Sequence, residues 1–198
     1  MNLLAHAYLS FNLPDILLGN MISDYVKGKT QYTYPLPVQH GIRLHRDIDS
    51  FTDTHKATKE LKSFFRPHYR LYAGAFADVV YDHFLANDEE QFRSEKELRH
   101  FTAWCYRELK DKETLFPKPF ERMFPYMQEQ DWLYNYRFRE GIHKSFYGLA
   151  RRAAYIAEAE TAFAIFNEEF EAMQACYTAF FPELKAYAAY RLEALLNG

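Results

Sequence analysis

Apolar positions recur along the chain at intervals of three and four residues, which is the spacing of an amphipathic helix. The sequence has no long run of alternating apolar and polar residues of the kind that strands favour. Prolines and glycines punctuate the helical pattern. The expected helices cover about 14–27, 38–52, 70–87 and 95–110, followed by a restart at Pro117 and Pro119, two or three helices within 126–181 that break near Gly141 and Gly148, and a last helix from Pro182 to Asn197 and Gly198.

The balance of aliphatic residues supports an all-α fold. The chain has 22 Ala and 20 Leu against 4 Val and 7 Ile, and helices favour Ala and Leu whereas strands favour β-branched residues. Its 198 residues include no repeat, linker or low-complexity tract. We therefore expect one compact multi-helix domain over 1–198, with the residues that carry chemistry in 1–86 and aromatic helices in 87–198.

Charge and apolar runs narrow the classes of partner. The net charge of −3 gives no support for nucleic-acid binding. No apolar run approaches the ~20 residues that span a bilayer, and the N-terminal residues lack the basic segment of a signal peptide. The two cysteines lie too far apart in sequence for a zinc site and do not form a disulfide framework. We expect a cytoplasmic protein without membrane or nucleic-acid partners.

One predicted helix places ionisable groups in an apolar sector. In the segment GIRLHRDIDSFTD, His45, Asp49 and Asp53 are spaced by four residues and share one side of a helix. His45 and Asp49 fall between two apolar arcs, where an unpaired carboxylate costs several kcal/mol unless a cation compensates it. A metal is one such cation. An arginine pair or a helix cap is the alternative.

Three other segments repeat this feature, although a solvated acidic edge or a core histidine would explain each of them alone. The residues concerned are His6, Asn20, Asp24, Lys27, Asp78, Asp82 and His83. Carboxylate and imidazole ligands together suit a divalent metal such as Mn²⁺ or Mg²⁺, and the lack of thiolates argues against structural zinc. Such an ion polarises a phosphoryl oxygen and acidifies bound water, so the set is typical of metal-assisted phosphoester hydrolysis.

Four sequence blocks then point to a family. MNLLAHAYLS, GNMISDYVKG, GIRLHRDIDSFTD and DVVYDHFLA occur in this order within 1–86 and resemble the acyl carrier protein phosphodiesterases. The resemblance implies hydrolysis of the phosphodiester between 4′-phosphopantetheine and a serine of holo-acyl carrier protein, with Mn²⁺ preferred. It also implies a fold distantly like that of HD-domain phosphohydrolases. The chain has no His-Asp dipeptide, only the reversed pair Asp82-His83, so HD ligand roles cannot be transferred by position.

The family blocks and the helical spacing together give a hypothesis for the site. Five residues are expected to hold the metal or to orient its ligands: Asp24, His45, Asp49, Asp78 and Asp82. Asp24 and Asp78 are the first candidates for direct ligation or water activation. His6 and His83 are expected to orient the phosphate or to protonate the leaving serine oxygen. Lys27 and Arg46 would neutralise phosphate charge, and Asn20 would hold the second oxygen of a ligand.

Two further features concern the substrate. Residues 27–70 contain nine Lys or Arg against four acids, a local balance of +5, so this patch, with Lys56, Lys59 and Lys62, would steer an acidic carrier protein. An ordinary solvated lysine-rich loop is the alternative. A second set of residues would line a channel for the pantetheine arm or simply pack together: Tyr126, Trp132, Tyr134, Tyr136 and Phe138.

Two other functions remain open at this point. The same metal site would serve a phosphohydrolase that acts on a nucleotide or another small phosphodiester. A helical module that binds carrier proteins without turnover is the second alternative. An assay of holo-carrier and nucleotides with Mn²⁺ separates these functions.

Overall fold

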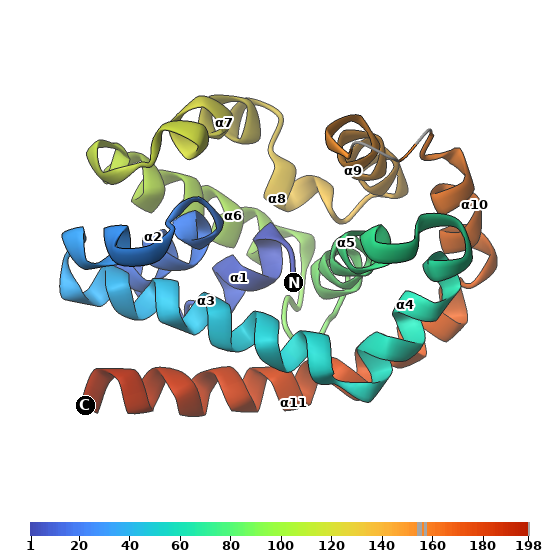
Figure 1. Ribbon diagram of the computed structural model, residues 1–198, viewed down its shortest axis with the longest axis horizontal. Helices are drawn as coiled ribbons and strands as arrows, with labels where there is room; N and C mark the ends of the chain where they lie inside the picture. Colours follow the sequence, from blue (N-terminus) through green and yellow to red (C-terminus); the bar gives the residue numbers. More distant parts are fainter. Residues whose placement is uncertain (154–155, 157, 198) are drawn as a thin grey trace.

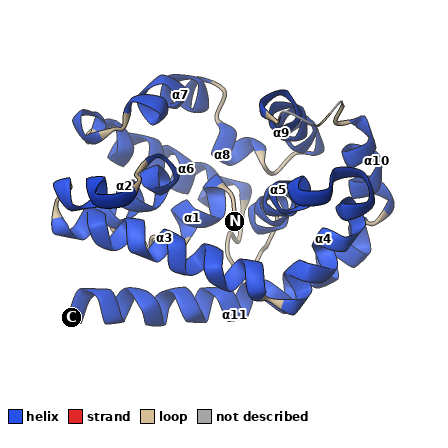
Figure 2. Cartoon of the chain, viewed as in Figure 1, coloured by secondary structure: helices blue, strands red, loops and turns tan. Residues whose placement is uncertain are grey.

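The computed structural model describes residues 1–153, 156 and 158–197. These residues are helical and contain no strand, which confirms the predicted all-α class (Figure 2). None of the described helices combines the length and apolarity needed to cross a membrane. The α-helices are α1 (Leu3–Tyr8), α2 (Pro14–Ile22), α3 (Leu36–Thr54), α4 (Lys56–Tyr69), α5 (Ala73–Ala86), α6 (Glu95–Lys110), α7 (Lys118–Glu129), α8 (Trp132–Asn135), α9 (Arg139–Arg152), α10 (Glu160–Glu168) and α11 (Phe170–Asn197). Short 3₁₀ helices are η1 (Ser23–Tyr25), η2 (Gly28–Thr33), η3 (Arg70–Tyr72) and η4 (Glu113–Leu115).

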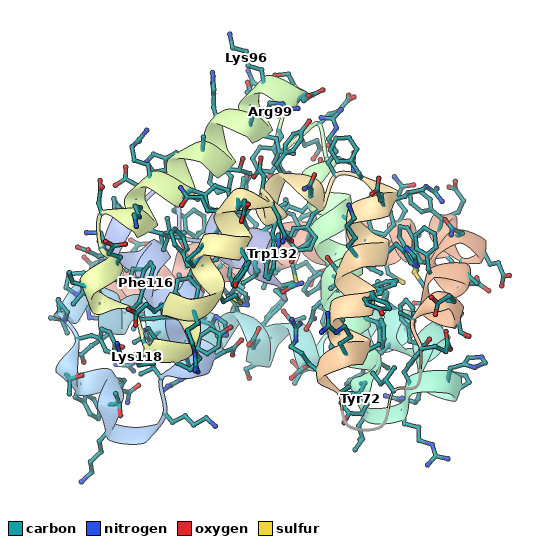
Figure 3. The ribbon with its side chains drawn as sticks, turned by 90° about the horizontal axis from the view of Figure 1, so that it is seen from above. Tyr72, Lys96, Arg99, Phe116, Lys118 and Trp132 are labelled. Atoms are coloured by element: carbon teal, nitrogen blue, oxygen red, sulfur yellow. The ribbon has the colours of Figure 1, made fainter. Side chains whose placement is uncertain are left out.

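The short helix α1 lies in the middle of the molecule and contacts both α2 and α5 (Figure 1). Helix α3 packs along α2, and the long helix α11 runs beside α3 and continues against α4. Helices α6 to α9 cover the opposite side, where Lys96 extends from α6 away from the rest of the molecule (Figure 3). The start of the chain is consequently interior: Leu4, Ala5 and Ala7 are completely buried.

Local chemistry explains where several helices begin. Ser94 Oγ accepts a hydrogen bond from Glu97 N at 3.3 Å, and Glu97 Oε2 accepts one from Arg93 N at 2.8 Å, a reciprocal cap at the start of α6. His55 Nδ1 accepts from Ala57 N at 3.2 Å and caps α4. Helix α4 occupies a stretch for which the sequence pattern predicted no helix, so the lysine-rich loop considered there as an alternative is helical.

Two predicted helices are shorter than expected. The helix expected over 14–27 ends at Ile22 and gives way to η1, and Gly28, with φ of 56°, starts η2 in the left-handed region that glycine tolerates. The helix expected from residue 70 begins at Ala73, after η3. Helix ends depend on local hydrogen bonding and are the least certain part of a pattern-based prediction.

Two predicted breaks were wrong. Pro182 lies inside α11 instead of opening it, because the buried side chains Phe180, Phe181 and Leu184 hold this stretch against its neighbours. Helix α9 runs through Gly141 and Gly148 without interruption. A Cβ at Gly141 would lie 1.9 Å from the carbonyl oxygen of Asn135, so this glycine allows α9 to approach the end of α8. The last helix ends at Asn197 as predicted, and Gly198 lies outside the described residues.

Candidate metal centre

The close crossing of α2 and α3 sets the geometry of the site. A Cβ at Gly19 would lie 2.1 Å from the carbonyl oxygen of Val38, and one at Gly41 would lie 2.3 Å from that of Ile16. These separations are far below any real contact, so only glycine lets the two backbones approach this closely. The crossing brings Asn20 on α2 against His45, which lies one turn after Gly41 on α3.

Asn20 orients two imidazole rings. His45 Nδ1 lies 2.8 Å from the carbonyl oxygen of Asn20, and Nδ1 must donate because a carbonyl oxygen only accepts. Asn20 Nδ2 donates to the carbonyl oxygen of His6 at 2.9 Å and to Ser10 Oγ at 3.1 Å, which turns Oδ1 toward His6 Nδ1 at 3.0 Å. Both rings thus carry hydrogen on Nδ1, and they stack with centroids 3.9 Å apart.

Both Nε2 atoms face carboxylates. His45 Nε2 lies 3.2 Å from Asp24 Oδ1 and 3.1 Å from Asp49 Oδ2. His6 Nε2 lies 3.2 Å from Asp49 Oδ1, yet it is buried and has no hydrogen-bond partner among the described residues. Ligand atoms of His6, His45 and Asp49 all lie within 4.8 Å of one another. We call these three residues, together with Asp24, the His/Asp cluster.

Electrostatics shows that the His/Asp cluster requires positive charge. Burial disfavours the imidazolium of His45, but hydrogen bonds with Asp24 and Asp49 outweigh burial and raise its pKa to about 9. Burial and the charge of His45 lower the pKa of His6 to about 4. Burial alone would raise the pKa of Asp49, yet the hydrogen bond from protonated His45 and the charge of the Met1 amino group hold that pKa well below its usual range. A proton on His45 therefore offsets the carboxylates, and a bound cation would take over that task.

The N-terminal amino group connects Asp78 to the His/Asp cluster. The nitrogen of Met1 lies 3.2 Å from Asp49 Oδ1 and 3.2 Å from Asp78 Oδ1. Burial would lower the pKa of this amino group, but Asp78 and Asp49 raise it to about 10. Burial raises the pKa of Asp78. The structure thus brings Asp24, Asp49 and Asp78 together from three different elements, in one series of contacts.

Asp82 and His83 lie apart from the His/Asp cluster. The oxygens of Asp82 accept hydrogen bonds from Leu4 N at 2.7 Å and Ala5 N at 3.1 Å, so this buried side chain caps the start of α1. Burial raises the pKa of Asp82 to about 7. His83 Nδ1 bonds to the carbonyl oxygen of Tyr136 at 2.8 Å, and its ring packs against Phe166. Adjacent in sequence, the two side chains serve different parts of the fold.

The two cations expected to neutralise phosphate also have distinct surroundings. Arg46 donates to Gln31 Oε1 at 2.7 Å and to the carbonyl oxygen of Val26 at 3.1 Å, so it ties the segment between α2 and α3 to α3. Lys27 is exposed and lies just after η1, three residues beyond Asp24. The side chain of Asp24 is itself 75% exposed, which places it at the rim of the site.

The basic and aromatic segments are only partly accessible. Lys56 and Lys59 are exposed on α4, whereas Lys62 pairs with Asp53 at 2.6 Å. Among the aromatic residues predicted to line a channel, Tyr126 and Phe138 are exposed, Trp132 is half-buried, and Tyr134 and Tyr136 are buried. The hydroxyl of Tyr136 accepts a hydrogen bond from Asn2 Nδ2 at 2.9 Å and so connects this segment to the start of the chain. The channel stays a prediction.

Four parts of the site were missing from the sequence-based hypothesis. Ser10, Gly19, Gly41 and the amino group of Met1 all contact or position members of the His/Asp cluster. The two glycines carried a usable signal, because a glycine inside a helix costs about 1 kcal/mol relative to alanine and usually has a packing reason. Ser10 and the amino group gave no comparable signal.

The His/Asp cluster fits a divalent cation. It offers two imidazole nitrogens and carboxylate oxygens, a mixed donor set that suits Mn²⁺ and similar ions. Nε2 of His6 is buried and has a lone pair without a hydrogen-bond partner among the described residues. Asn20 fixes the orientation of both imidazoles, as residues that hydrogen-bond to metal-binding histidines do. Fold and site together define an all-helical protein in which two buried imidazoles face partly exposed carboxylates, a donor set that suits a divalent metal.

Comparison with known proteins identifies the family. The model of the family "Acyl carrier protein phosphodiesterase" matches residues 1–184. A relative of that name from Enterobacter sp. (strain 638) is 30% identical over 188 residues, covering 95% of this chain and 97% of the relative. Acyl carrier protein phosphodiesterase from Escherichia coli O139:H28 is 27% identical over 191 residues, covering 96% and 99%. No solved structure matched. The chain belongs to the acyl carrier protein phosphodiesterase family.

Proposed function

We propose that this protein is a divalent-metal-dependent phosphodiesterase that hydrolyses the bond between 4′-phosphopantetheine and the serine of holo-acyl carrier protein. Membership of the family and the names of relatives that align along nearly their whole length support this substrate. The convergence of two oriented imidazoles and Asp49 supports a metal, with Mn²⁺ as the first choice and Mg²⁺ as an alternative.

The observation that carries the proposal is the orientation of the imidazoles by Asn20. Because each Nδ1 donates to an oxygen of Asn20, each neutral ring presents the lone pair of Nε2 to the carboxylate of Asp49. A lone pair that faces a carboxylate oxygen at 3.2 Å is repulsive unless a proton or a metal lies between them. A proton on His45 satisfies one of these contacts in the metal-free protein, His6 Nε2 is left without a partner among the described residues, and a cation that both rings share would satisfy both contacts.

Each residue then has a task. His6, His45 and Asp49 would hold the ion, which when bound supplies Lewis acidity toward a phosphoryl oxygen and acidifies water. Hydrogen bonding with His45 lowers the pKa of Asp24, so its exposed carboxylate is ionised at neutral pH and is placed to orient water at the rim. Lys27, exposed and three residues beyond Asp24, would approach a phosphate from the same rim. Arg46, Asp82 and His83 support the fold around the site in this proposal.

An assay with holo-carrier tests the proposal. The protein is incubated with Mn²⁺ and holo-acyl carrier protein, and mass spectrometry follows the loss of phosphopantetheine from the carrier. We expect conversion to apo-carrier that EDTA abolishes. Asp49→Asn should slow it by more than about a hundredfold, because a ligand is lost. The control Asp47→Asn alters a residue that pairs with Arg191 and should leave the rate within about twofold.

Two outcomes would contradict the proposal. Hydrolysis of a nucleotide panel without hydrolysis of holo-carrier would assign the site to another phosphodiester. Binding of the carrier without release of phosphopantetheine, under saturating Mn²⁺, would make the protein a non-catalytic carrier-binding module.

A further inference from the structure

A basic pocket opens one helical turn away from the His/Asp cluster. Its volume is about 540 Å³, and it lies where α3, α4, η3 and α5 meet. The lining residues that matter here are Asp53, Lys62, Arg66, Arg70, Leu71 and Gly74. We call this cavity the basic pocket.

The basic pocket is adjacent to the site along two helices. Asp53 follows Asp49 by one turn on α3, and Gly74 precedes Asp78 by one turn on α5, a rise of about 6 Å in each case. Lys62 joins the two sides: its Nζ lies 2.6 Å from Asp53 Oδ1, and its side chain crosses Gly74, where an added Cβ would lie 3.4 Å from Cε. A group held in the pocket is therefore next to the groups that hold the ion.

The basic pocket has uncompensated positive charge. Its one acid, Asp53, is already paired with Lys62. Arg66 and Arg70 are exposed, and neither forms an ion pair with any residue in the described part of the chain. Two guanidinium groups about one turn apart, beside the ion pair of the largely buried Lys62 with the exposed Asp53, attract carboxylates and orient them.

The rim of the pocket also carries an apolar anchor. Leu71 is 98% exposed, more than any other large apolar side chain that the structure describes, and it lies on η3 directly after Arg70. Arg70 has φ of 47°, a conformation that costs energy for a residue with a side chain. A strained turn thus exposes Leu71 beside Arg66 and Arg70. An exposed leucine next to cations is complementary to a partner surface that has acidic residues around an apolar one.

A second cavity provides a comparison. It has a volume of about 380 Å³ and is lined in part by Arg43, Arg46 and Asp47. Arg46 is engaged with Gln31 and the carbonyl oxygen of Val26, and Asp47 with Arg191. Arg43 and Asp47 also lie roughly 120° to 160° around α3 from Asp49, so this cavity opens on another side of the helix. Of the two cavities, the basic pocket is the one that lies one helical turn from the His/Asp cluster. Its arginines form no ion pair in the described part of the chain, whereas Arg46 of the second cavity is already hydrogen-bonded.

We infer that the basic pocket and Leu71 form the surface on which an acidic carrier protein docks. Carboxylates of the carrier contact Arg66 and Arg70, and an apolar side chain of the carrier covers Leu71. The modified serine then faces the rim of the His/Asp cluster. The identity of the partner rests on the proposed function, whereas the surface itself rests on the charges, the cavity and the exposed leucine.

Binding of apo-carrier tests this inference without any hydrolysis. The apo form has no phosphodiester, so its affinity reports docking alone. Fluorescence anisotropy of labelled apo-carrier is measured against the full chain at low and at 0.3 M salt. We expect Arg66→Glu/Arg70→Glu to weaken binding by at least about tenfold at low salt, and Leu71→Ser by about fivefold at both salt concentrations.

Two controls separate the site from bulk charge and from misfolding. Arg66→Lys/Arg70→Lys keeps the charge and should retain binding within about threefold. Lys118→Glu/Arg122→Glu makes the same charge change on two residues one turn apart on α7. Figure 3 shows Lys118 on one side of the molecule and Tyr72, which belongs to η3, on the other. This variant should therefore also retain binding. Three results would overturn the inference. The α7 variant could lose as much affinity as the pocket variant, or Arg66→Glu/Arg70→Glu could bind the carrier as well as the unaltered protein does. The third is that the unaltered protein does not bind apo-carrier. Absence of hydrolysis with intact binding would overturn only the proposed function.

Discussion

At the scale of single residues, Asn20 has the most connected role in the site. Its backbone oxygen orients His45, and its side chain orients His6 and bonds to Ser10. The residue is completely buried, so none of these bonds competes with water. Sequence reasoning singled out Asn20 as a partner for a ligand oxygen, but it could not show that one amide fixes two imidazoles, because the contact with His6 depends on how α1 and α2 pack.

Replacing Asn20 tests this role. Asn20→Ala leaves His6 Nδ1 without its acceptor and frees the ring to rotate. We expect the affinity for Mn²⁺, measured by isothermal titration calorimetry, to fall by about ten- to a hundredfold. The control Ser10→Ala removes one bond to Asn20 but leaves Asn20 bonded to His6, and should change that affinity by less than about threefold. Unchanged Mn²⁺ affinity in Asn20→Ala would show that the imidazoles do not need this orientation.

Asp82 gives the protein a predictable response to pH. Burial raises its folded-state pKa to about 7 from an ordinary value of 3.8. The folded state therefore takes up a proton that the unfolded state does not, so this carboxyl contributes more stability as pH falls from about 8 toward 5, and that contribution is lost as pH rises through 7. The slope of the free energy of unfolding approaches about 1.4 kcal/mol per pH unit at most, the value for a difference of one bound proton.

Urea denaturation at several pH values checks the response of Asp82. The variant Asp82→Asn cannot titrate and keeps only one acceptor for the two N–H groups of Leu4 and Ala5. The difference in the free energy of unfolding, unaltered protein minus Asp82→Asn, should increase as pH is lowered from 8 to 5. A constant gap between the two proteins across this range would mean that Asp82 does not bind a proton there.

At the scale of helices, the contact between α2 and α3 decides whether the site forms. Gly41→Ala places a methyl group 2.3 Å from the carbonyl oxygen of Ile16 and 2.9 Å from the Cα of Gly19. The helices must separate, which should lower the free energy of unfolding by at least about 2 kcal/mol and lengthen the contact between Asn20 and His45. We expect thermal unfolding at a lower temperature and weaker Mn²⁺ binding together.

Gly148→Ala is the matched control for the helix crossing. Among the residues that the structure describes, the nearest atom to its Cβ would be Arg152 Nη1 at 3.8 Å, and alanine favours a helix over glycine by about 0.5 to 1 kcal/mol. This variant should be slightly more stable and should bind Mn²⁺ normally. If Gly41→Ala behaved in the same way, the close backbone contact would not be a requirement of the site.

The helices also show how far local patterns extend. The four-residue spacing of His45 and Asp49 on α3 correctly placed the two side chains side by side, since the spacing is a property of one helix, but only His45 is buried, whereas the side chain of Asp49 is 39% exposed. The role of Pro182 was predicted wrongly because buried neighbours on other helices outweigh the local cost of proline. The same limit explains Gly141, whose function depends on the backbone of Asn135 in another helix.

At the scale of the whole molecule, the interior N-terminus organises the site. Helix α1 is held on one side by Asp82 from α5 and on the other by Asn20 from α2, and it carries His6 between them. The sequence identified the residue types and the segments, but not that α1 is central, because no local pattern encodes which short helix becomes enclosed by the others (Figure 1). The family resemblance supplied the expected substrate, whereas the residues alone left open other phosphohydrolases and a helical module that binds carrier proteins without turnover.

The most direct test of the central claim locates the metal itself. Crystals of the unaltered protein are soaked in Mn²⁺, and anomalous scattering near the manganese edge is mapped. We expect a strong peak between His6 Nε2, His45 Nε2 and the carboxylate of Asp49, and its disappearance in His45→Gln. If the His/Asp cluster stays empty at saturating Mn²⁺, or if Mn²⁺ binds only at other residues, the His/Asp cluster is not a metal site.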